Sequence, residues 1–308
     1  REGPCLCEAD FNKDGLDDLF IGSAKEQISI IYYQTADGNF VSYKEPFEVD
    51  ILSEDVDCLV DDFNGDGLLD LIVASGGSEY SKYSPELRDR LYLNKGYMNF
   101  EKSKNAFSSI LSFESTSTIS SDDLDNDGDN DLFIGTRLNP GSYGTKTKNF
   151  VLINNGFGVF EDLTYQYLGN QESLEMVTDS KFTDIDNDGK NELVIVGEWM
   201  PISIFSNEQG KFLNQTSSLG LDGSNGFWNS VEKADLDGVE VEATLTGLPL
   251  EAKELIMTKL PIGKLQMMNM VNREFNGLSR NAYIEKLKAE QTKRNREMAH
   301  LTEIGIDK

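Results

Sequence analysis

The fold is decided by a short acidic stretch, DDLDNDGDNDLFIG, at residues 122–135. Three other stretches repeat its pattern: ADFNKDGLDDLFIG at 9–22, DDFNGDGLLDLIVASG at 61–76 and TDIDNDGKNELVIVG at 183–197. A shorter copy, ADLDG, begins at residue 234. The first aspartate of each loop falls at residues 10, 62, 123, 184 and 235, which gives spacings of 52, 61, 61 and 51. The chain is therefore built from a repeat of 51 to 61 residues.

Each repeat contains four short segments that look like β-strands. In the second repeat, DVDCLV (55–60) precedes the acidic loop, DLIVAS (70–75) follows it, and DRLYLN (89–94) ends at a glycine turn. The fourth segment begins at Phe100, and phenylalanines mark the same place at residues 40, 160 and 212. Four short strands joined by Gly, Asn and Asp turns are typical of a β-propeller blade. The fixed period favours a propeller over the alternative, a β-sandwich of unrelated strands.

The acidic loops have the spacing of a metal site made only of oxygen ligands. Counting the first aspartate as position 1, oxygen-bearing side chains stand at positions 1, 3, 5 and 9, glycine at position 6, and a backbone carbonyl at position 7. Glycine permits the sharp bend, and alternate side chains then turn toward one point. The predicted ligands are Asp10, Asn12, Asp14, Leu16 (carbonyl) and Asp18; Asp62, Asn64, Asp66, Leu68 (carbonyl) and Asp70; Asp123, Asp125, Asp127, Asp129 (carbonyl) and Asp131; and Asp184, Asp186, Asp188, Lys190 (carbonyl) and Glu192.

Ca²⁺ is the predicted ion. Converging carboxylates repel one another unless a cation lies between them, and a hard cation that takes six to eight oxygens suits this set better than Mg²⁺ does. The absence of a soft ligand disfavours zinc and copper. For any single loop, a solvated Asp/Asn/Gly turn without metal is the alternative interpretation.

An EF-hand loop begins in the same way but ends with a glutamate ligand at position 12. This chain has apolar residues there, which we expect to be buried in strands: Ile21, Val73, Ile134 and Ile195. The predicted site therefore closes at position 9 and leads directly into a β-strand.

Composition excludes two classes of partner. The 308 residues include 28 Lys+Arg and 54 Asp+Glu, a net charge of −26. Phosphate backbones and anionic membrane surfaces are bound by clustered Lys and Arg, so we expect no nucleic acid partner. The longest apolar runs are only as long as strands, so we also expect no membrane insertion.

The last 70 residues differ from the rest. Residues 239–308 carry 11 Lys+Arg and 10 Asp+Glu, which leaves 17 and 44 for residues 1–238. Five of the eight methionines lie in this tail, and Pro249 and Ser279 are candidate helix starts. We predict two domains: a β-propeller at 1–238 and a mainly α-helical tail without a recognisable family at 239–308.

The three cysteines, Cys5, Cys7 and Cys58, lack the spacing of a metal site. Cys5 and Cys7 alternate onto one face of a strand, which favours core packing over a disulfide. The sequence begins Arg1-Glu2-Gly3-Pro4, without an initiator Met or a charged-then-apolar leader, so we expect that processing or truncation has removed whatever preceded it.

The pattern D-x-[DN]-x-D-G-x-x-[DE], followed by an apolar strand and Gly, resembles the FG-GAP or VCBS repeat of integrin α-subunit propellers and of many secreted bacterial proteins. The phrases GEWMPISIF at 197–205 and GFWNS at 226–230 resemble bacterial VCBS-repeat proteins joined to an ASPIC/UnbV domain. The resemblance covers residues 1–238 and implies an all-β propeller with structural Ca²⁺. The Ca²⁺ loops would bridge the first two strands of a blade, on the face opposite the usual ligand face.

The chain departs from that family pattern in two ways. Four full repeats and a partial fifth do not close the usual seven-bladed ring, so we expect part of a larger propeller. The fifth loop stops at Asp235-Leu236-Asp237-Gly238 and lacks a ligand at position 5, so we expect weak or no metal binding there.

We expect a binding module and not an enzyme. His300, in the tail, is the only histidine, which excludes Ser-His-Asp and two-His metal chemistry on the propeller. A pair of carboxylates acting on a glycosidic bond is not excluded by composition, although no carboxylate outside the loops stands out.

Two long segments, Ser75–Arg90 and Arg137–Asn149, are rich in Tyr, Ser, Gly and Lys and occupy the same place in successive repeats. Such loops suit recognition of a protein or glycan ligand, with Tyr80, Tyr83 and Tyr143 as the first expected contacts, or they are plain solvated connections. The resemblance implies adhesion or recognition that is extracellular or at the cell surface. The alternative is a scaffold or substrate-binding domain of a secreted multidomain enzyme, for example a carbohydrate-active one, whose catalytic part is elsewhere.

Overall fold

The computed structural model describes residues 4–110, 114–171, 173–186 and 188–233, which all belong to one compact unit of the chain. The predicted helical tail and the fifth loop at Asp235 lie outside these residues. The described part is almost entirely β-structure, as the sequence predicts. None of its helices has the length and apolar character needed to cross a membrane.

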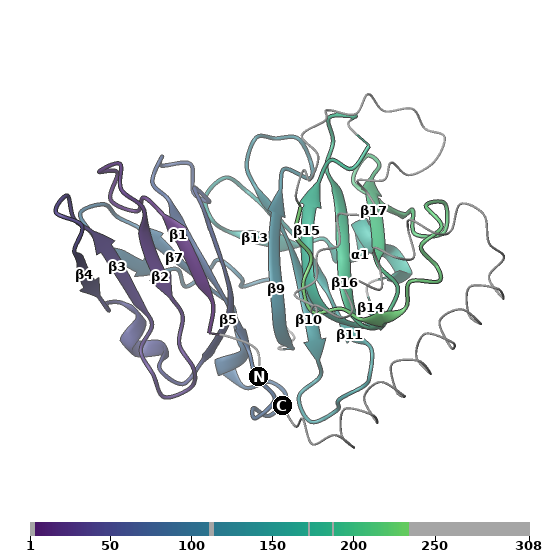
Figure 1. The fold of residues 1–308 in the computed structure, drawn as a ribbon, viewed down its shortest axis with the longest axis horizontal. Helices are drawn as coiled ribbons and strands as arrows, with labels where there is room; N and C mark the ends of the chain where they lie inside the picture. The colour runs from purple at the N-terminus through teal and green to yellow at the C-terminus, as the bar shows by residue number, and fades with distance from the viewer. Residues whose placement is uncertain (1–3, 111–113, 172, 187, 234–308) are drawn as a thin grey trace, which may run out of the picture. The chain divides into compact units, whose positions relative to one another are not determined.

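Four antiparallel sheets, each with four strands in sequence order, follow one another along the chain (Figure 1). Their bounds, sheet by sheet, are β1 (Leu6–Ala9), β2 (Asp18–Ile21), β3 (Ile30–Gln34) and β4 (Phe40–Tyr43); β5 (Glu54–Asp61), β6 (Asp70–Gly76), β7 (Arg90–Asn94) and β8 (Phe100–Lys102); β9 (Ser115–Asp122), β10 (Asp131–Leu138), β12 (Phe150–Asn154) and β13 (Phe160–Asp162); and β15 (Met176–Thr183), β16 (Glu192–Met200), β17 (Ser203–Asn207) and β18 (Phe212–Asn214). These sheets are the four predicted propeller blades.

The first strands of successive blades contact one another: β1 contacts β5, β5 contacts β9, and β9 contacts β15. Each acidic loop joins the first strand of its blade to the second, and position 9 is the first residue of the second strand. The acidic loops therefore lie at one end of the blades. The loops that join second and third strands lie at the other end.

A few short elements stand outside this scheme. The pair β11 (Thr147–Lys148) and β14 (Ser173–Leu174) lies beside the third blade, and a single turn of α-helix, α1 (Thr164–Leu168), follows β13. Short 3₁₀ turns occupy Phe47–Asp50, Pro85–Leu87 and Gly169–Gln171. The sequence pattern of strands and turns does not predict the helical turn, which is too short to show a period.

The hydrophobic cores lie between neighbouring blades. Phe20, Phe47 and Tyr92 pack between the first two blades, for example, while Phe133 and Phe205 pack between the third and the fourth. Because the inner blades are covered on both faces, their second strands are continuous apolar runs, not alternating ones.

The residues at position 12 are strand residues, as predicted, and three of them are buried: Val73, Ile134 and Ile195. Ile21, also expected to be buried, is 38 % exposed. It pairs with the exposed Leu6 on the face of the first blade that is turned away from Cys7 and from the second blade. A one-sided strand cannot be distinguished from a two-sided one by its apolar run alone.

Cys7 and Cys58 form a disulfide with a Cα–Cα distance of 6.1 Å, which corrects the expectation that Cys5 and Cys7 both serve core packing. The bridge joins β1 to β5, and its two cysteines are 51 residues apart, about one repeat period. Equivalent strands of adjacent blades bring the two side chains together, which local alternation along one strand could not reveal. Cys5 is buried and free.

The segment that precedes the fifth repeat, residues 226–231, packs against the fourth blade. β19 (Gly226–Phe227) pairs with β16, and the backbone N–H of Val231 donates to Asp179 Oδ2 at 2.8 Å. Val231 is buried with Val194 and Val196 on the far side of the blade from the third one. An equivalent bond runs from the Ile119 N–H of the third blade to Asp57 Oδ2 of the second, also at 2.8 Å. The blade-to-blade contacts thus continue toward a fifth repeat.

Candidate metal centres

The four acidic loops share one hydrogen-bond scheme, which the second loop illustrates. Asp62 accepts the N–H of Asp66 on Oδ1 at 3.1 Å and the N–H of Gly67 on Oδ2 at 2.7 Å. Asn64 Oδ1 accepts the Asp66 N–H at 2.9 Å, and Asp66 Oδ1 accepts the Leu68 N–H at 2.9 Å. The other three loops repeat all four bonds at 2.8–3.2 Å. The side chains at positions 1, 3 and 5 are therefore folded back onto the loop and do not splay into solvent.

Left-handed backbone makes this fold-back possible. The glycines at position 6 have φ between +82° and +98°, as the sequence predicts: Gly15, Gly67, Gly128 and Gly189. Position 4 is left-handed as well, at Lys13, Gly65 and Asn126, with φ between +59° and +70°. Sequence reasoning missed this second bend, because only one of the three residues is a glycine.

Position 9 has a double role. Asp70 is fully buried, and it accepts the N–H of Phe63 on Oδ2 at 3.2 Å and the N–H of Asn94 on Oδ1 at 2.8 Å. Asp18 and Asp131 make the same pair of bonds, and Glu192 accepts the Ile185 N–H at 2.9 Å. This residue ties the loop to the third strand of its own blade, a role that ligand spacing does not predict.

The electrostatics of these loops favour a cation. The pKa values of Asp70, Asp131 and Glu192 are raised to about 7. Burial is the main cause and the neighbouring loop carboxylates add to it, while backbone hydrogen bonds act in the opposite direction. Burial, followed by the charge of Asp127, raises the pKa of Asp125 above its ordinary value. Each loop therefore holds carboxylates whose ionised form is disfavoured until positive charge is supplied.

The carboxylates gather most closely in the third and fourth loops. Oxygens of Asp123, Asp125 and Asp127 lie within 4.8 Å of one another, as do those of Asp184, Asp186 and Glu192. Asp129 Oδ1, in the third loop, is buried and has no hydrogen-bond partner among the described residues. Burial and the charges of Asp127, Asp125 and Asp123 raise the pKa of Asp129 to about 6. An oxygen-only set with an unpartnered buried oxygen beside it fits a hard divalent cation.

All twenty predicted ligand residues thus lie in four equivalent loops. Positions 1, 3 and 5 face inward, position 7 is placed by the bond from its N–H to position 5, and position 9 closes the loop at the start of the second strand.

The third strands of the second, third and fourth blades each end in an asparagine that links the blade to the preceding one, whereas β3 of the first blade ends in Gln34. Asn94 Nδ2 donates to the Phe11 carbonyl at 2.8 Å, Asn154 Nδ2 to the Phe63 carbonyl at 3.0 Å, and Asn207 Nδ2 to the carbonyl of Leu124 at 2.7 Å. Each acceptor is position 2 of the preceding blade's metal loop. The recurring Asn before the glycine turn is the sequence signal that could have found this link.

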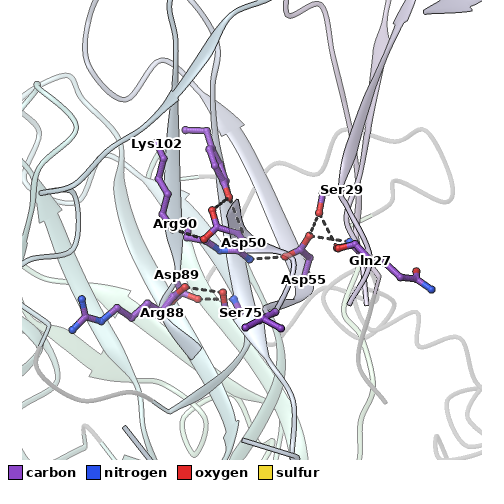
Figure 2. Close-up of polar contacts among 12 residues, drawn as sticks. Gln27, Ser29, Asp50, Asp55, Ser75, Arg88, Asp89, Arg90 and Lys102 are labelled. Carbon is purple, nitrogen blue, oxygen red and sulfur yellow. Dashed lines mark hydrogen bonds and ion pairs between the residues drawn. The ribbon is translucent and has the colours of Figure 1, made fainter. Parts of the chain in front are cut away.

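A buried ion pair lies within the second blade, and its aspartate is also hydrogen-bonded to the first blade (Figure 2). Arg90 Nη2 lies 2.5 Å from Asp55 Oδ1, and both side chains are buried. Asp55 Oδ2 accepts the Ser23 N–H at 2.8 Å and the Ser29 hydroxyl. A buried charge with this many partners fixes the geometry between blades, and loss of one partner would leave the other charge uncompensated.

Asp89 extends this polar contact to the third blade (Figure 2 shows its bond to Ser75). It accepts the Ser75 N–H on Oδ1 at 2.7 Å and the Thr116 hydroxyl on Oδ2 at 3.0 Å. A cavity of about 540 Å³ lies beside it, lined in part by Asp50, Lys102 and Phe107. Lys102 Nζ is already paired with Asp50 Oδ1 at 2.5 Å.

The three tyrosines expected to be first contacts have different environments. Tyr80 is only 8 % exposed and donates its hydroxyl to the Leu52 carbonyl, so that expectation is wrong for Tyr80, which is part of the packing between blades. Tyr83 and Tyr143 are exposed.

One known family of repeats is similar to this chain. The family model described as FG-GAP-like repeat matches residues 10–73 and again residues 62–134. No curated protein sequence matches the chain. Seventy chains of solved structures do match.

One of these solved structures is a lectin from Agrocybe aegerita, described for specific recognition of non-reducing terminal N-acetylglucosamine. It is 18 % identical, with a TM-score of 0.42, over 67 % of this chain and 49 % of the lectin chain. This chain therefore spans about half the length of that lectin.

The matched region holds the first and second loops in full and the third loop up to Ile134, and the fourth loop keeps the same ligand spacing and the same hydrogen bonds. Residues 10–134 of the chain are therefore FG-GAP-like repeats.

Proposed function

We propose that this chain is a non-catalytic recognition or adhesion module of the extracellular space or cell surface, with Ca²⁺ as a structural ion in the four loops. The observation that carries the proposal is the shared loop geometry, in which oxygens at positions 1, 3 and 5 face inward at four equivalent places. Ions there would neutralise the carboxylates and hold the first two strands of each blade together.

The Cys7–Cys58 disulfide supports the extracellular part of the proposal. Disulfides persist in oxidising compartments and are rare in the cytosol. The partner in this proposal is a protein or a glycan, since the loops between second and third strands carry exposed aromatic residues such as Tyr83 and Tyr143. The alternative function, a scaffold domain for a secreted enzyme, would use the same surface.

Calorimetric titration of the chelated full chain with Ca²⁺ tests the metal part. One site per loop is expected, together with a rise in melting temperature, because a ligand that binds only the native state stabilises it by about 2.7 kcal/mol at a hundred times its Kd. Fewer than two sites, or an unchanged melting temperature, would contradict the proposal.

The variant Asp66→Asn sharpens this test. It keeps an oxygen for the Leu68 N–H but removes one charge from the second loop. One site should weaken by about tenfold or more while the loops at Asp123 and Asp184 titrate normally. The exposed Asp37→Asn, outside the loops, is the matched control and should leave all sites unchanged.

A further inference from the structure

An exposed aromatic pair lies at the end of the fourth blade opposite its metal loop. Trp199 is 60 % exposed and Phe227 is 49 % exposed, with ring centroids 4.4 Å apart and ring planes at 64°. Trp199 comes near the end of β16, whose first residue is the ligand Glu192, so the length of the strand separates the pair from the ion. Large apolar side chains in contact at the surface mark an interaction site more often than scattered ones do.

The backbone is held in an unusual conformation that presents Trp199 outward. Its φ is +66°, in the left-handed region that residues with a side chain rarely adopt. A register shift between Glu198 and Met200 in the pairing of β16 with β19 surrounds it, and the Trp228 N–H donates to the Gly197 carbonyl at 3.2 Å. The strain is thus maintained by hydrogen bonds on both sides of the tryptophan.

A polar network borders the aromatic pair. Glu198, only 3 % exposed, accepts Arg137 Nε at 3.0 Å and Nη2 at 2.5 Å on Oε1. Its Oε2 accepts the hydroxyl of Tyr143, which is 63 % exposed, at 2.5 Å. Tyr143, from the connection between β10 and β12, and Arg137, from β10, thus bring hydrogen-bonding groups of the third blade to Glu198, next to Trp199 in β16 of the fourth blade.

The geometry selects the chemistry of the ligand. Rings in contact at 4.4 Å leave no space between them for a cation, so they do not form a cage. Their planes meet at 64°, so the pair offers a single ring face, here called the aromatic platform, and not a flat surface of two rings. Glu198 and Arg137 neutralise each other, which leaves no net charge to attract an ionic group, and the net charge of −26 repels polyanions. What remains is a neutral ligand with a flat face of C–H bonds and hydroxyl groups around its rim.

We propose that Trp199, Phe227 and Tyr143 form a binding site for a neutral carbohydrate, with a pyranose ring stacked on the aromatic platform. The partly positive C–H bonds of one sugar face lie against the negative face of an aromatic ring. The sugar hydroxyls meet the edge formed by Tyr143 and Arg137. This inference rests on the proposed recognition function and names the ligand class for one surface.

Tryptophan fluorescence and calorimetry on the full chain test the site, with cellotetraose and chitotetraose as probes. The chain has two tryptophans, so Trp228→Phe leaves Trp199 as the sole reporter. At least one probe should change the Trp199 emission. Trp199→Ala should lower that probe's affinity by about thirtyfold, the loss typical of a central aromatic contact, and Trp199→Phe should lower it less. Tyr165→Ala removes a tyrosine of α1 that is 74 % exposed and lies outside the proposed ligand surface, and it should leave the affinity within about twofold.

Three results would overturn the inference: neither probe binds, Trp199→Ala binds as tightly as the native chain, or Tyr165→Ala loses as much affinity as Trp199→Ala. A fall of the Trp199→Ala melting temperature beyond about 5 °C would identify a packing residue instead. The titrations are run with Ca²⁺ and with chelator. Failure to bind sugar beside intact Ca²⁺ binding rejects only the carbohydrate site, whereas failure to bind Ca²⁺ rejects the metal part of the proposed function.

Discussion

Asp89 shows how one carboxylate can make the fold depend on pH. It is partly buried between the second and third blades, with Arg90 and Asp57 as the nearest charged neighbours. Its pKa is raised to about 7, mainly by burial and in smaller part by the charge of Asp57. The hydrogen bonds from Ser75 and Thr116 and the charge of Arg90 act in the opposite direction. The folded chain therefore keeps a proton on Asp89 in a pH range where the unfolded chain has lost it.

The pH dependence that follows has a definite sign. A raised folded pKa contributes stability that is fully present below about pH 4 and is lost as the pH rises to about 7. Asp89→Asn cannot ionise, so the fall in its free energy of unfolding between pH 4 and 7 should be shallower by at most about 1.4 kcal/mol per pH unit. Urea denaturation at several pH values measures this. Glu101→Gln, on the outer strand β8, is the control, and equal slopes for Asp89→Asn and the native chain would contradict the assignment.

Single residues were predicted from sequence where spacing alone decides their role. Alternation within a tight loop implies that positions 1, 3 and 5 converge, and Asp62, Asn64 and Asp66 do so. The bond from Asn154 to the previous blade was missed, because no local pattern shows which neighbour a side chain will meet. Trp199 was quoted only for resemblance, since a left-handed backbone at tryptophan has no signal in composition.

At the scale of strands, the glycine that ends each repeated motif marks a close crossing. Gly135 illustrates it: a Cβ there would lie 2.6 Å from Val177 Cγ1 and 2.7 Å from Thr118 Cγ2. Gly76 meets Val56 and Thr116 in the same way at the junction with the third blade. These glycines let a second strand pass against the first strand of the next blade.

Gly135→Ala should therefore lower the free energy of unfolding by about 1–3 kcal/mol, the usual range for overpacking. Adding Val177→Ala should give a double variant that loses less than the sum of the two single losses, because the two side chains share one space. Gly223→Ala is the control, since nothing lies within 4 Å of a Cβ at that position. Strictly additive losses, measured by chemical denaturation, would show that the two sites are independent.

The strands themselves were predictable because each is a short apolar run between strong turn residues, and the repeat supplied four copies of the same signal. The pairing register of the strands was not predictable from the sequence. A shift lies between Asp55 and Asp57 in β5 and between Val177 and Asp179 in β15, and it turns Asp57 and Asp179 toward the next blade. Such irregularities arise from packing between blades, which a strand pattern does not contain.

At the scale of the molecule, the Cys7–Cys58 bridge is the covalent link between blades. The variant Cys7→Ser/Cys58→Ser should lose about 2–4 kcal/mol in free energy of unfolding, because the 51-residue loop is no longer closed in the unfolded chain. Thermal unfolding with and without reductant measures this, and the double variant should not respond to reductant. Thiol titration of the denatured, unreduced chain should find one free thiol, Cys5, and finding three would contradict the bridge.

The whole-molecule plan was predicted in outline, since a period with two landmarks implies blades. The pairing of the cysteines was not, because it depends on which strands become neighbours. The fifth loop, the tail and the predicted boundary at residue 238 lie beyond the described residues and stay predictions.

The hydrogen bond from the asparagine amide of a third strand to the loop of the preceding blade affects how such a chain can gain or lose repeats. The second and third repeats each bring one donor for the preceding repeat and one acceptor for the following repeat, so removing either of them whole would leave the new neighbours still matched. Gene duplication or excision in units of one period would then conserve these hydrogen bonds. A cut within a repeat would instead leave a buried asparagine amide without its acceptor. The polarity of these bonds makes the blades interchangeable in number but not reversible in order.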